Sequence, residues 1–328
     1  MGEAADSPSL DSLLKRLTLS TSRSFSLTLL ALPKTQRSSI AITYLLARYA
    51  DTLTDGGTWS LEDRLAYLDS WENFILGKIR PDAKWSLNAS VGAFRPEEAE
   101  LLMHGSDLLE AFHALPPRER ELGADLLKTL ISAMRWDLKN FPAAANGNAV
   151  KLGVKDRPLF DWYTYAIAGC VGEYWAKVFQ LPTDLEHFAT SYGKGLQRIN
   201  ILRDAEDDWK IGRVYFPRAD FESRGWLEKC PWTDDVENWK AYRAEYIRDT
   251  RELLQRGSYF CDSIPKLQFR LRWASAMPLL IGLKTLDLIE KNSSSKQKIT
   301  RDVVKKLAAG AWLKVILGQK FTTRGALA

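Results

Sequence analysis

Apolar residues recur along most of the chain at intervals of three and four positions, which is the spacing of one buried face of an α-helix. The strict alternation of a half-buried strand is nearly absent, and so are the Asn-Gly and Asp-Gly turns of hairpins. We therefore expect an all-α fold. The predicted helices cover residues 9–20, 36–55, 60–77, 96–114, 117–140, 159–180, 184–210, 236–262, 268–291 and 299–319.

The boundaries of these segments carry ordinary helix signals. Ser60 stands before Glu62 and Asp63 and is a typical N-cap, while Pro116-Pro117 opens the helix predicted over residues 117–140. Segments rich in Gly, Pro and Asn, such as residues 142–153 and 211–217, are expected to be loops. No internal repeat or long linker divides the chain, so we predict one helical-bundle domain over residues 1–328.

Composition excludes several classes of protein. The chain has 328 residues, of which 45% are hydrophobic and 27% charged, as in ordinary globular proteins. Its three cysteines and three histidines are scattered, which argues against a disulfide framework, a zinc site and a Ser-His-Asp triad. The first ten residues are polar and acidic rather than a secretory signal. We expect a cytoplasmic protein.

Positive charge is concentrated near the C-terminus. Residues 284–328 contain ten Lys or Arg and three Asp or Glu, a net charge of +7, whereas the whole chain carries +5. Such a tail is compatible with a solvated helix, with nucleic acid or with an anionic membrane surface. It lacks a recognised nucleic-acid motif, so we expect no nucleic-acid partner. The apolar positions between 303 and 317 predict packing on the core and, as a hypothesis, peripheral membrane contact.

Two pairs of aspartates have the spacing of neighbours on one helix face. Asp51 and Asp55 are four residues apart, with Arg48 three residues before the first of them. Two stacked carboxylates repel each other, and either the arginine or a divalent cation would offset that repulsion. Because acidic pairs of this spacing are also common on solvated helix faces, one pair alone is a weak signal.

The second pair strengthens the interpretation. Asp204 and Asp208 repeat the four-residue spacing, and Asn200 and Gln197 precede them on the same face. Carboxylate and amide oxygens are the ligands that Mg²⁺ prefers, and Mg²⁺ usually completes its shell with water and substrate phosphate oxygens. We therefore predict Mg²⁺ ligands at Asp51, Asp55, Asn200, Asp204 and Asp208, with diphosphates held between two such helices. Arg213, in the loop that follows, is a candidate phosphate clamp.

These residues belong to a series of motifs that resembles one known family, the squalene/phytoene synthases, which join prenyl diphosphates head to head. The motifs lie in order between about residues 20 and 220. They are Ser22-Arg-Ser-Phe25, the segment Tyr44–Asp55, Tyr163-Thr-Tyr-Ala-Ile-Ala-Gly-Cys-Val-Gly172, the segment Gln197–Asp208, and Gly212-Arg-Val-Tyr-Phe-Pro217.

The resemblance implies an all-α isoprenoid-synthase fold with a central cavity, Mg²⁺, and two allylic diphosphates as substrates. One substrate would ionise to an allylic cation, and the second would attack it to give a cyclopropyl diphosphate after loss of a proton. An aromatic, apolar cavity would exclude water from the cation, and aromatic faces would stabilise it. The two aspartate pairs would be the metal-binding motifs of the family.

The same resemblance assigns the remaining candidate residues. Arg48 and Arg213 match phosphate-binding arginines, and Tyr215 lies in the same binding loop. Tyr44 and Tyr163 match tyrosines of the cavity, and Tyr163 is suspected in proton removal. Ser22 and Phe25 match a flap over one substrate, although Thr21 stands where some relatives carry histidine. Gly172 would allow close approach of a prenyl chain or of a neighbouring helix.

The motifs look closer to those of bacterial squalene synthases, so we favour two farnesyl diphosphates as substrates and squalene as the product, with NADPH as the reductant. Phytoene or dehydrosqualene synthesis, which needs no reductant, is the alternative. A non-catalytic module that binds lipid or metal is a further, different possibility. The sequence leaves the oligomeric state open.

Overall fold

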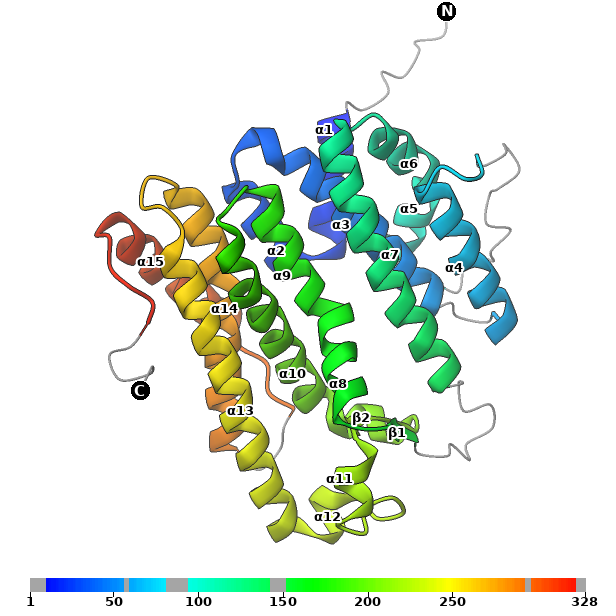
Figure 1. Cartoon of the computed structure of the whole chain (residues 1–328), viewed down its shortest axis with the longest axis vertical. Coiled ribbons are helices and arrows are strands. Elements are labelled where there is room, and N and C mark those ends of the chain that lie inside the picture. The colour runs from blue at the N-terminus through cyan, green and yellow to red at the C-terminus, as the bar shows by residue number, and fades with distance from the viewer. Residues whose placement is uncertain (1–9, 56–58, 81–93, 142–151, 293–295, 323–328) are drawn as a thin grey trace, which may run out of the picture. The chain divides into compact units, whose positions relative to one another are not determined.

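The computed structural model describes residues 10–55, 59–80, 94–141, 152–292 and 296–322. The chain divides into two compact units, Met1–Met134 and Arg135–Ala328, and each is described by itself (Figure 1). Nearly all regular structure in both units is helical, which confirms the predicted all-α fold. The single domain expected from the sequence stays a prediction.

The first unit is built around one long helix, α3. Its helices are α1 (Leu10–Thr21), α2 (Arg23–Ala31), α3 (Lys34–Asp55), α4 (Leu61–Ile75), α5 (Pro96–Met103), α6 (Gly105–His113) and most of α7 (Pro117–Asn140). The buried face of α3 carries Tyr49, whose ring stacks on Trp71 of α4 at 3.8 Å. Trp71 also donates a hydrogen bond to the Leu46 carbonyl, which fixes α4 against α3.

Helix starts in this unit follow the local sequence. Ser60 is the N-cap of α4, as the sequence predicted, and in the structure it forms a capping box with Asp63. The single helix expected over residues 96–114 is instead two helices that meet at His104. Gly105 follows the break, and a Cβ there would lie 2.7 Å from the Tyr49 ring, so close packing against α3 accompanies the interruption.

The second unit is centred on α10, which packs against α9, α13 and α14 (Figure 1). Its helices are α8 (Arg157–Thr164), a π-helix (Tyr165–Gly169), α9 (Cys170–Val178), a 3₁₀ turn (Thr183–Leu185), α10 (Glu186–Lys210), α11 (Arg218–Glu222), α12 (Pro231–Asp234), α13 (Val236–Ser263), α14 (Phe269–Lys291) and α15 (Arg301–Ile316). No helix among the described residues is long and apolar enough to cross a bilayer.

The helix predicted over residues 159–180 is continuous in direction but not in type. A π-helical turn at Tyr165–Gly169 separates α8 from α9, and such turns occur mostly as local insertions, frequently at functional sites. The glycines around this turn let α10 approach closely. A Cβ on Gly172 would lie 2.0 Å from the Ala189 carbonyl oxygen, and one on Gly193 would lie 2.2 Å from that of Ala168.

A short parallel sheet, which the sequence pattern did not predict, joins two segments that we expected to be loops. Strand β1 (Leu152–Val154) pairs with β2 (Arg213–Pro217), with an irregularity in the register after Gly153. Alternation in β2 buries Val214 and Phe216 and leaves Arg213 and Tyr215 on the other, half-buried side. The buried side faces aromatic rings of α11 and α13, including Phe221. The pairing therefore fixes the direction of Arg213 and Tyr215.

Candidate active site

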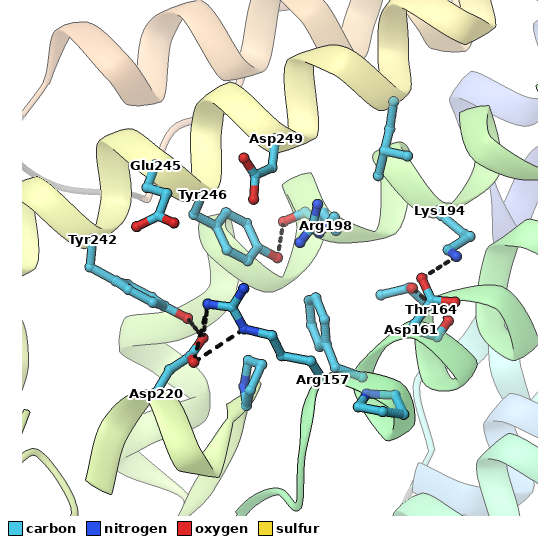
Figure 2. A pocket seen from close by; sticks show the side chains of 14 residues that line it. Arg157, Asp161, Thr164, Lys194, Arg198, Asp220, Tyr242, Glu245, Tyr246 and Asp249 are labelled. Atoms are coloured by element: carbon cyan, nitrogen blue, oxygen red, sulfur yellow. Dashed lines mark hydrogen bonds and ion pairs between the residues drawn. The ribbon is translucent and has the colours of Figure 1, made fainter. Parts of the chain in front are cut away.

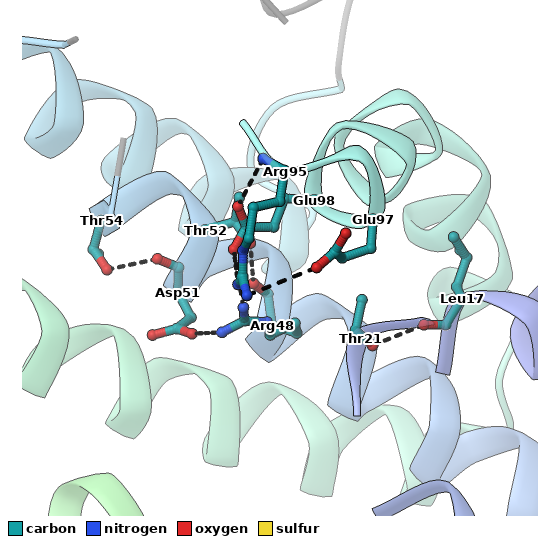
Figure 3. Close-up of polar contacts among 9 residues, drawn as sticks. All are labelled: Leu17, Thr21, Arg48, Asp51, Thr52, Thr54, Arg95, Glu97 and Glu98. Carbon is teal, nitrogen blue, oxygen red and sulfur yellow. Dashed lines mark hydrogen bonds and ion pairs between the residues drawn. The ribbon is translucent and has the colours of Figure 1, made fainter. Parts of the chain in front are cut away.

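In the first unit, the predicted metal ligands lie at the end of α3. Asp51 and Asp55 fall on one helix face, as their spacing requires. Arg48 forms an ion pair with Asp51 one turn earlier, and its other terminal nitrogen donates to Glu98 of α5 at 3.2 Å (Figure 3). The arginine is thus held between the aspartate motif and a second helix.

Glu98 is a support residue that the sequence analysis missed. Its side chain is only 9% exposed and also forms an ion pair with Arg95, which holds the pKa of Glu98 below its usual value. Glu98 is the third residue of α5, where its carboxylate accepts a hydrogen bond from the Arg95 backbone N–H at 3.3 Å. The sequence Arg95-Pro-Glu-Glu98 carries the proline and acidic residues of a helix start, but nothing in it indicates contact with Arg48, fifty positions away.

The carboxylate of Asp51 is poorly solvated although 41% of the side chain remains exposed. Desolvation by the surrounding protein raises its pKa to about 6, and repulsion from Asp55 adds to this, while Arg48 opposes it. A carboxylate in such surroundings favours a cation more than a solvated surface aspartate does.

The predicted flap residues have specific partners within the same unit. Ser22 is the N-cap of α2, and its hydroxyl accepts a hydrogen bond from the backbone N–H of Phe25. The Phe25 ring lies 4.4 Å from that of Tyr44 on α3. Thr21, the last residue of α1, donates its hydroxyl to the Leu17 carbonyl (Figure 3). The structure therefore brings Phe25 and Tyr44 together and gives Ser22 a capping role.

In the second unit, the other metal-binding motif lies along the last turns of α10. Asn200 donates to the Gln197 side chain at 3.3 Å, and Arg203 holds Asp204 through two hydrogen bonds of 2.8 and 2.5 Å. The intervening Asp207 points elsewhere, because it pairs with Lys210 and Lys296. The local sequence does not show which of these aspartates belong to the predicted metal site, whereas their ion-pair partners distinguish Asp207 from Asp204.

Asp208 lies beside the β2 loop. Desolvation and repulsion from Asp204 raise its pKa to about 7, and the positive charge of Arg213 works in the opposite direction. Arg213 is itself 3.7 Å from Asp137, on the last turns of α7. The predicted phosphate clamp and the second aspartate motif are therefore electrostatically linked within this unit.

Asp137 also joins the two predicted tyrosines and was missed in the sequence analysis. The Tyr163 hydroxyl donates to Asp137 Oδ1 at 3.3 Å. The Tyr163 and Tyr215 rings stack at 5.2 Å with an interplanar angle of 18°. Burial, with the negative charge of Asp137 adding to it, raises the pKa of Tyr163 well above its ordinary value, so the phenol stays protonated.

Gly172 packs directly against the backbone of α10. The carbonyl of Ala189 occupies the direction that a side chain would take, so tight helix packing accounts for this glycine. Its predicted role beside a prenyl chain stays a prediction.

The donor sets fit a divalent cation that also binds substrate. Each unit offers two carboxylates at four-residue spacing, and one carboxylate of each pair is desolvated and repelled by its neighbour. Among the described residues no three His, Cys, Asp or Glu side chains converge as a complete metal cage. Mg²⁺ commonly takes only one or two protein carboxylates and fills its shell with water and phosphate oxygens, which is compatible with such pairs.

A pocket of about 510 Å³ in the second unit, with several charged side chains in its lining, contains none of the predicted site residues (Figure 2). It lies between α8, α10 and α13. Two of its cations are already matched, since Arg157 pairs with Asp220 and Lys194 pairs with Asp161. We assign no part of the chemistry to this pocket.

The family model for squalene/phytoene synthase matches residues 19–306 of the chain, a span that includes every predicted site residue. The chain belongs to the squalene/phytoene synthase family. Members of this family are prenyltransferases that act on prenyl diphosphates and typically use Mg²⁺.

Several curated relatives are similar at low identity. Squalene synthase ERG9 of Gibberella zeae is 24% identical over 245 residues, covering 72% of this chain and 47% of the relative. Presqualene diphosphate synthase of Zymomonas mobilis is 28% identical over 62% of this chain and 59% of the relative. For 15-cis-phytoene synthase of Synechococcus elongatus the identity is 24%, over 85% of this chain and 83% of the relative. The chain spans roughly half the length of the first of these relatives.

Solved structures show the same fold. A ligand complex of TcSQS matches with a TM-score of 0.71 at 21% identity, covering 94% of this chain and 88% of that one. The squalene synthase HpnC from Alicyclobacillus acidocaldarius matches with a TM-score of 0.60 at 22% identity, over 86% and 93% of the two chains. The isoprenoid-synthase fold expected from the motifs is thereby confirmed.

Proposed function

We propose that this protein joins two farnesyl diphosphates head to head to form presqualene diphosphate and then reduces it with NADPH to squalene. The observation that carries the first step is the pair of acidic helix ends, each with a desolvated carboxylate and its own arginine. The preference for farnesyl diphosphate and squalene rests on the likeness of the motifs to bacterial squalene synthases.

The arginines and aspartates would bind the diphosphates and stabilise their departure. Arg48 and Arg213 are fixed by Glu98 and Asp137 respectively, so little rearrangement is needed when a phosphate replaces part of their contacts. Mg²⁺, when bound by Asp51, Asp55, Asn200, Asp204 and Asp208 together with phosphate oxygens, supplies positive charge to the leaving group. The two supported arginines would add fixed donors on the protein's side.

Tyr163 and Asp137 suit the removal of a proton from the carbocation. The phenol is held protonated by burial and donates to Asp137, so it cannot act as a free phenolate. In our proposal the phenol oxygen accepts the substrate proton as its own proton passes to the Asp137 carboxylate. The substrate C–H bond breaks, its electron pair closes the cyclopropane ring, and Asp137 becomes a carboxylic acid.

The aromatic side chains would keep water from the cation. Tyr163 and Tyr215 stack beside Asp137 in the second unit, while Tyr44 and Phe25 form a ring pair in the first. Aromatic faces attract cations through their quadrupoles, and an apolar wall denies water a hydrogen-bonding site. Both effects protect an allylic cation until the second substrate attacks.

Phytoene or dehydrosqualene synthesis is the second candidate, and the similarity to a phytoene synthase favours keeping it. The two candidates differ in whether a hydride is added after the cyclopropyl intermediate ionises. No described residue is assigned to NADPH, and no step here depends on where it binds.

A product assay tests the proposal. Purified protein is incubated with farnesyl diphosphate and Mg²⁺, with and without NADPH, and the products are identified by mass spectrometry. Squalene that forms only with NADPH would support the proposal, and presqualene diphosphate is expected to accumulate without it. Dehydrosqualene formed regardless of NADPH would move the protein to the second candidate, as would phytoene formed from geranylgeranyl diphosphate. A failure to release diphosphate from either substrate would favour a non-catalytic binding module.

The proposal includes a cytoplasmic location with peripheral membrane contact near the basic C-terminal helix. The expected product is a hydrocarbon, which must enter a lipid phase. The oligomeric state is a separate question for light scattering and does not enter the mechanism.

A further inference from the structure

The second unit exposes an apolar surface where the start of α14 meets the end of α15. Five large side chains there are between 47% and 93% exposed, and we call them the apolar cap. They are Leu267, Phe269, Leu313, Ile316 and Leu317. The three cap residues at the end of α15 lie outside the apolar face that the sequence pattern predicted to pack on the core. Ala311 and Val315 of that predicted face are buried.

The helices that carry the cap are held together by ring stacking and hydrogen bonds. The Trp312 ring stacks on that of Trp273 at 5.3 Å and lies 6.1 Å from Phe269. Trp273 also donates to the Ala308 carbonyl, which ties α14 to α15. After α15, the backbone N–H of Phe321 donates to the Asp262 carboxylate at 2.8 Å. The apolar side chains are therefore displayed by a fixed framework.

The exposed charges around the cap all have one sign, since the side chain of the neighbouring Asp262 is only 8% exposed and lies 3.6 Å from the buried Arg272 guanidinium. Residues 263–275 and 311–322 contain no Asp or Glu, and Lys266, Arg270, Lys314 and Lys320 stand among the apolar residues. Within the described part of the chain, none of these four makes an ion pair. Lys266 reaches over the last turn of α15, since its Nζ lies 3.5 Å from the place where a Cβ on Gly318 would be.

We infer that the apolar cap docks this protein on an anionic lipid surface. Exposed leucine, isoleucine and phenylalanine would enter the interface between headgroups and acyl chains, while the surrounding lysines and arginine meet the lipid phosphates. A symmetric contact with a second copy would instead bring identical basic groups toward one another, which like-charge repulsion opposes.

The position of the cap gives docking a defined orientation. Tyr192 of α10 donates to the Ser275 carbonyl near the start of α14, whereas Asp204 and Asp208 lie 12 and 16 residues further along α10, roughly 18–24 Å at 1.5 Å per residue. Further along the pair, Gly282 of α14 packs against Leu196 and Ile199 of α10, so the two helices run in the same direction and the cap, at the start of α14, is at the opposite end from the aspartates. Docking would leave the diphosphate-binding loop away from the lipid. The inference rests on the proposed function only for the purpose of the contact, delivery of a hydrocarbon.

Vesicle flotation tests the inference with the full chain. Phosphatidylcholine vesicles with and without phosphatidylglycerol serve as probes at low and high salt. We expect the wild type to float with the anionic vesicles and to release them at high salt. The apolar variant L313Q/I316Q and the charge variant K266E/K320E should both lose flotation, the latter by about fivefold or more per charge reversed. All four positions are exposed, so folding should be unaffected.

Two variants at the far end of the same unit are the controls. Val236→Gln replaces an exposed apolar residue at the start of α13, and Lys229→Glu reverses an exposed charge before α12. Both should float like the wild type. Absence of wild-type flotation at low salt, or equal loss in the controls, would overturn the inference. A concentration-dependent dimer abolished by L313Q/I316Q would overturn it in favour of self-association.

Activity measured with detergent-dispersed farnesyl diphosphate separates this inference from the proposed function. The cap variants should retain wild-type turnover there. A protein that floats but releases no diphosphate would refute the proposed function and keep the docking surface. A protein that makes product but does not float would refute the docking surface and the peripheral membrane contact, and would keep the proposed reaction.

Discussion

The two aspartate pairs have the same spacing in sequence but are supported differently in the two units. In the first, the arginine that neutralises Asp51 is on the same helix and is braced by one buried glutamate, Glu98. In the second, Asp204 has its own neighbour Arg203, whereas Asp208 depends on Arg213 from a strand. The spacing brings the carboxylates together, and the surrounding unit decides what balances their charge.

The largest effect is expected from removing one carboxylate of each pair. Asp51→Asn and Asp204→Asn should each reduce diphosphate release by about 10³-fold or more, because substrate and Mg²⁺ would share a weakened site. Helical circular dichroism should be unchanged. Asp207→Asn is the matched control, since Asp207 lies in the same acidic run but pairs with Lys210 and Lys296. Retained turnover in both test variants would refute the metal assignment.

Asp137→Asn should reduce turnover by about 10²–10³-fold, since the phenol would lose its proton acceptor. Turnover should fall more with this substitution than with substitution of an aspartate on the surface of the second unit. Asp161→Asn, at an exposed position on α8, is the control.

A double-mutant cycle distinguishes proton transfer from a purely structural role. If Asp137 acts through Tyr163, Asp137→Asn should have little further effect in a Tyr163→Phe background. Fully additive losses would contradict that coupling and would leave Asp137 as a support for Arg213.

Glu98→Gln should have a smaller effect, confined to the first unit. Loss of the buried charge leaves Arg48 and Arg95 without their shared carboxylate, which should cost about 1–3 kcal/mol of stability. Weaker positioning of Arg48 should raise KM about tenfold with a lesser change in kcat. Glu97→Gln, whose side chain is more exposed and makes only a 3.7 Å contact with Arg95, should be nearly neutral. Equal destabilisation by both variants would contradict the bracing role.

The smallest expected effect concerns pH and metal-free stability. Because the folded pKa of Asp208 is raised to about 7, its protonated form stabilises the fold fully below about pH 4, and this stabilisation is lost as the pH rises through 7. Asp208→Asn avoids that loss. Without metal at pH 8 the variant should therefore unfold a few degrees higher than the wild type, corresponding to about 1 kcal/mol after allowance for partial solvation.

Thermal unfolding scans at pH 4 and pH 8 check this sign. The advantage of Asp208→Asn should shrink at pH 4, and Mg²⁺ should stabilise the wild type more than the variant. A variant less stable than the wild type at pH 8 without metal would show that Arg213 compensates the carboxylate fully.

The local patterns of the sequence determined much of this molecule. Apolar spacing placed the long helices within a few residues, and the four-residue spacing of the aspartates put each pair on one helix face. Arg48 and Arg203 belong to the same local patterns, because a helix turn brings nearby residues together whatever the rest of the chain does.

Only the tertiary structure decided how those motifs are held. Pairing of β1 with β2, the break at His104, the brace from Glu98 and the junction at Asp137 all depend on residues far apart in sequence. The apolar cap likewise arises where α14 meets α15, from side chains outside the apolar face of α15 that the sequence pattern predicted to pack on the core. Periodicity reports contacts within one turn of a helix, whereas these features come from packing between elements, which no short-range pattern encodes.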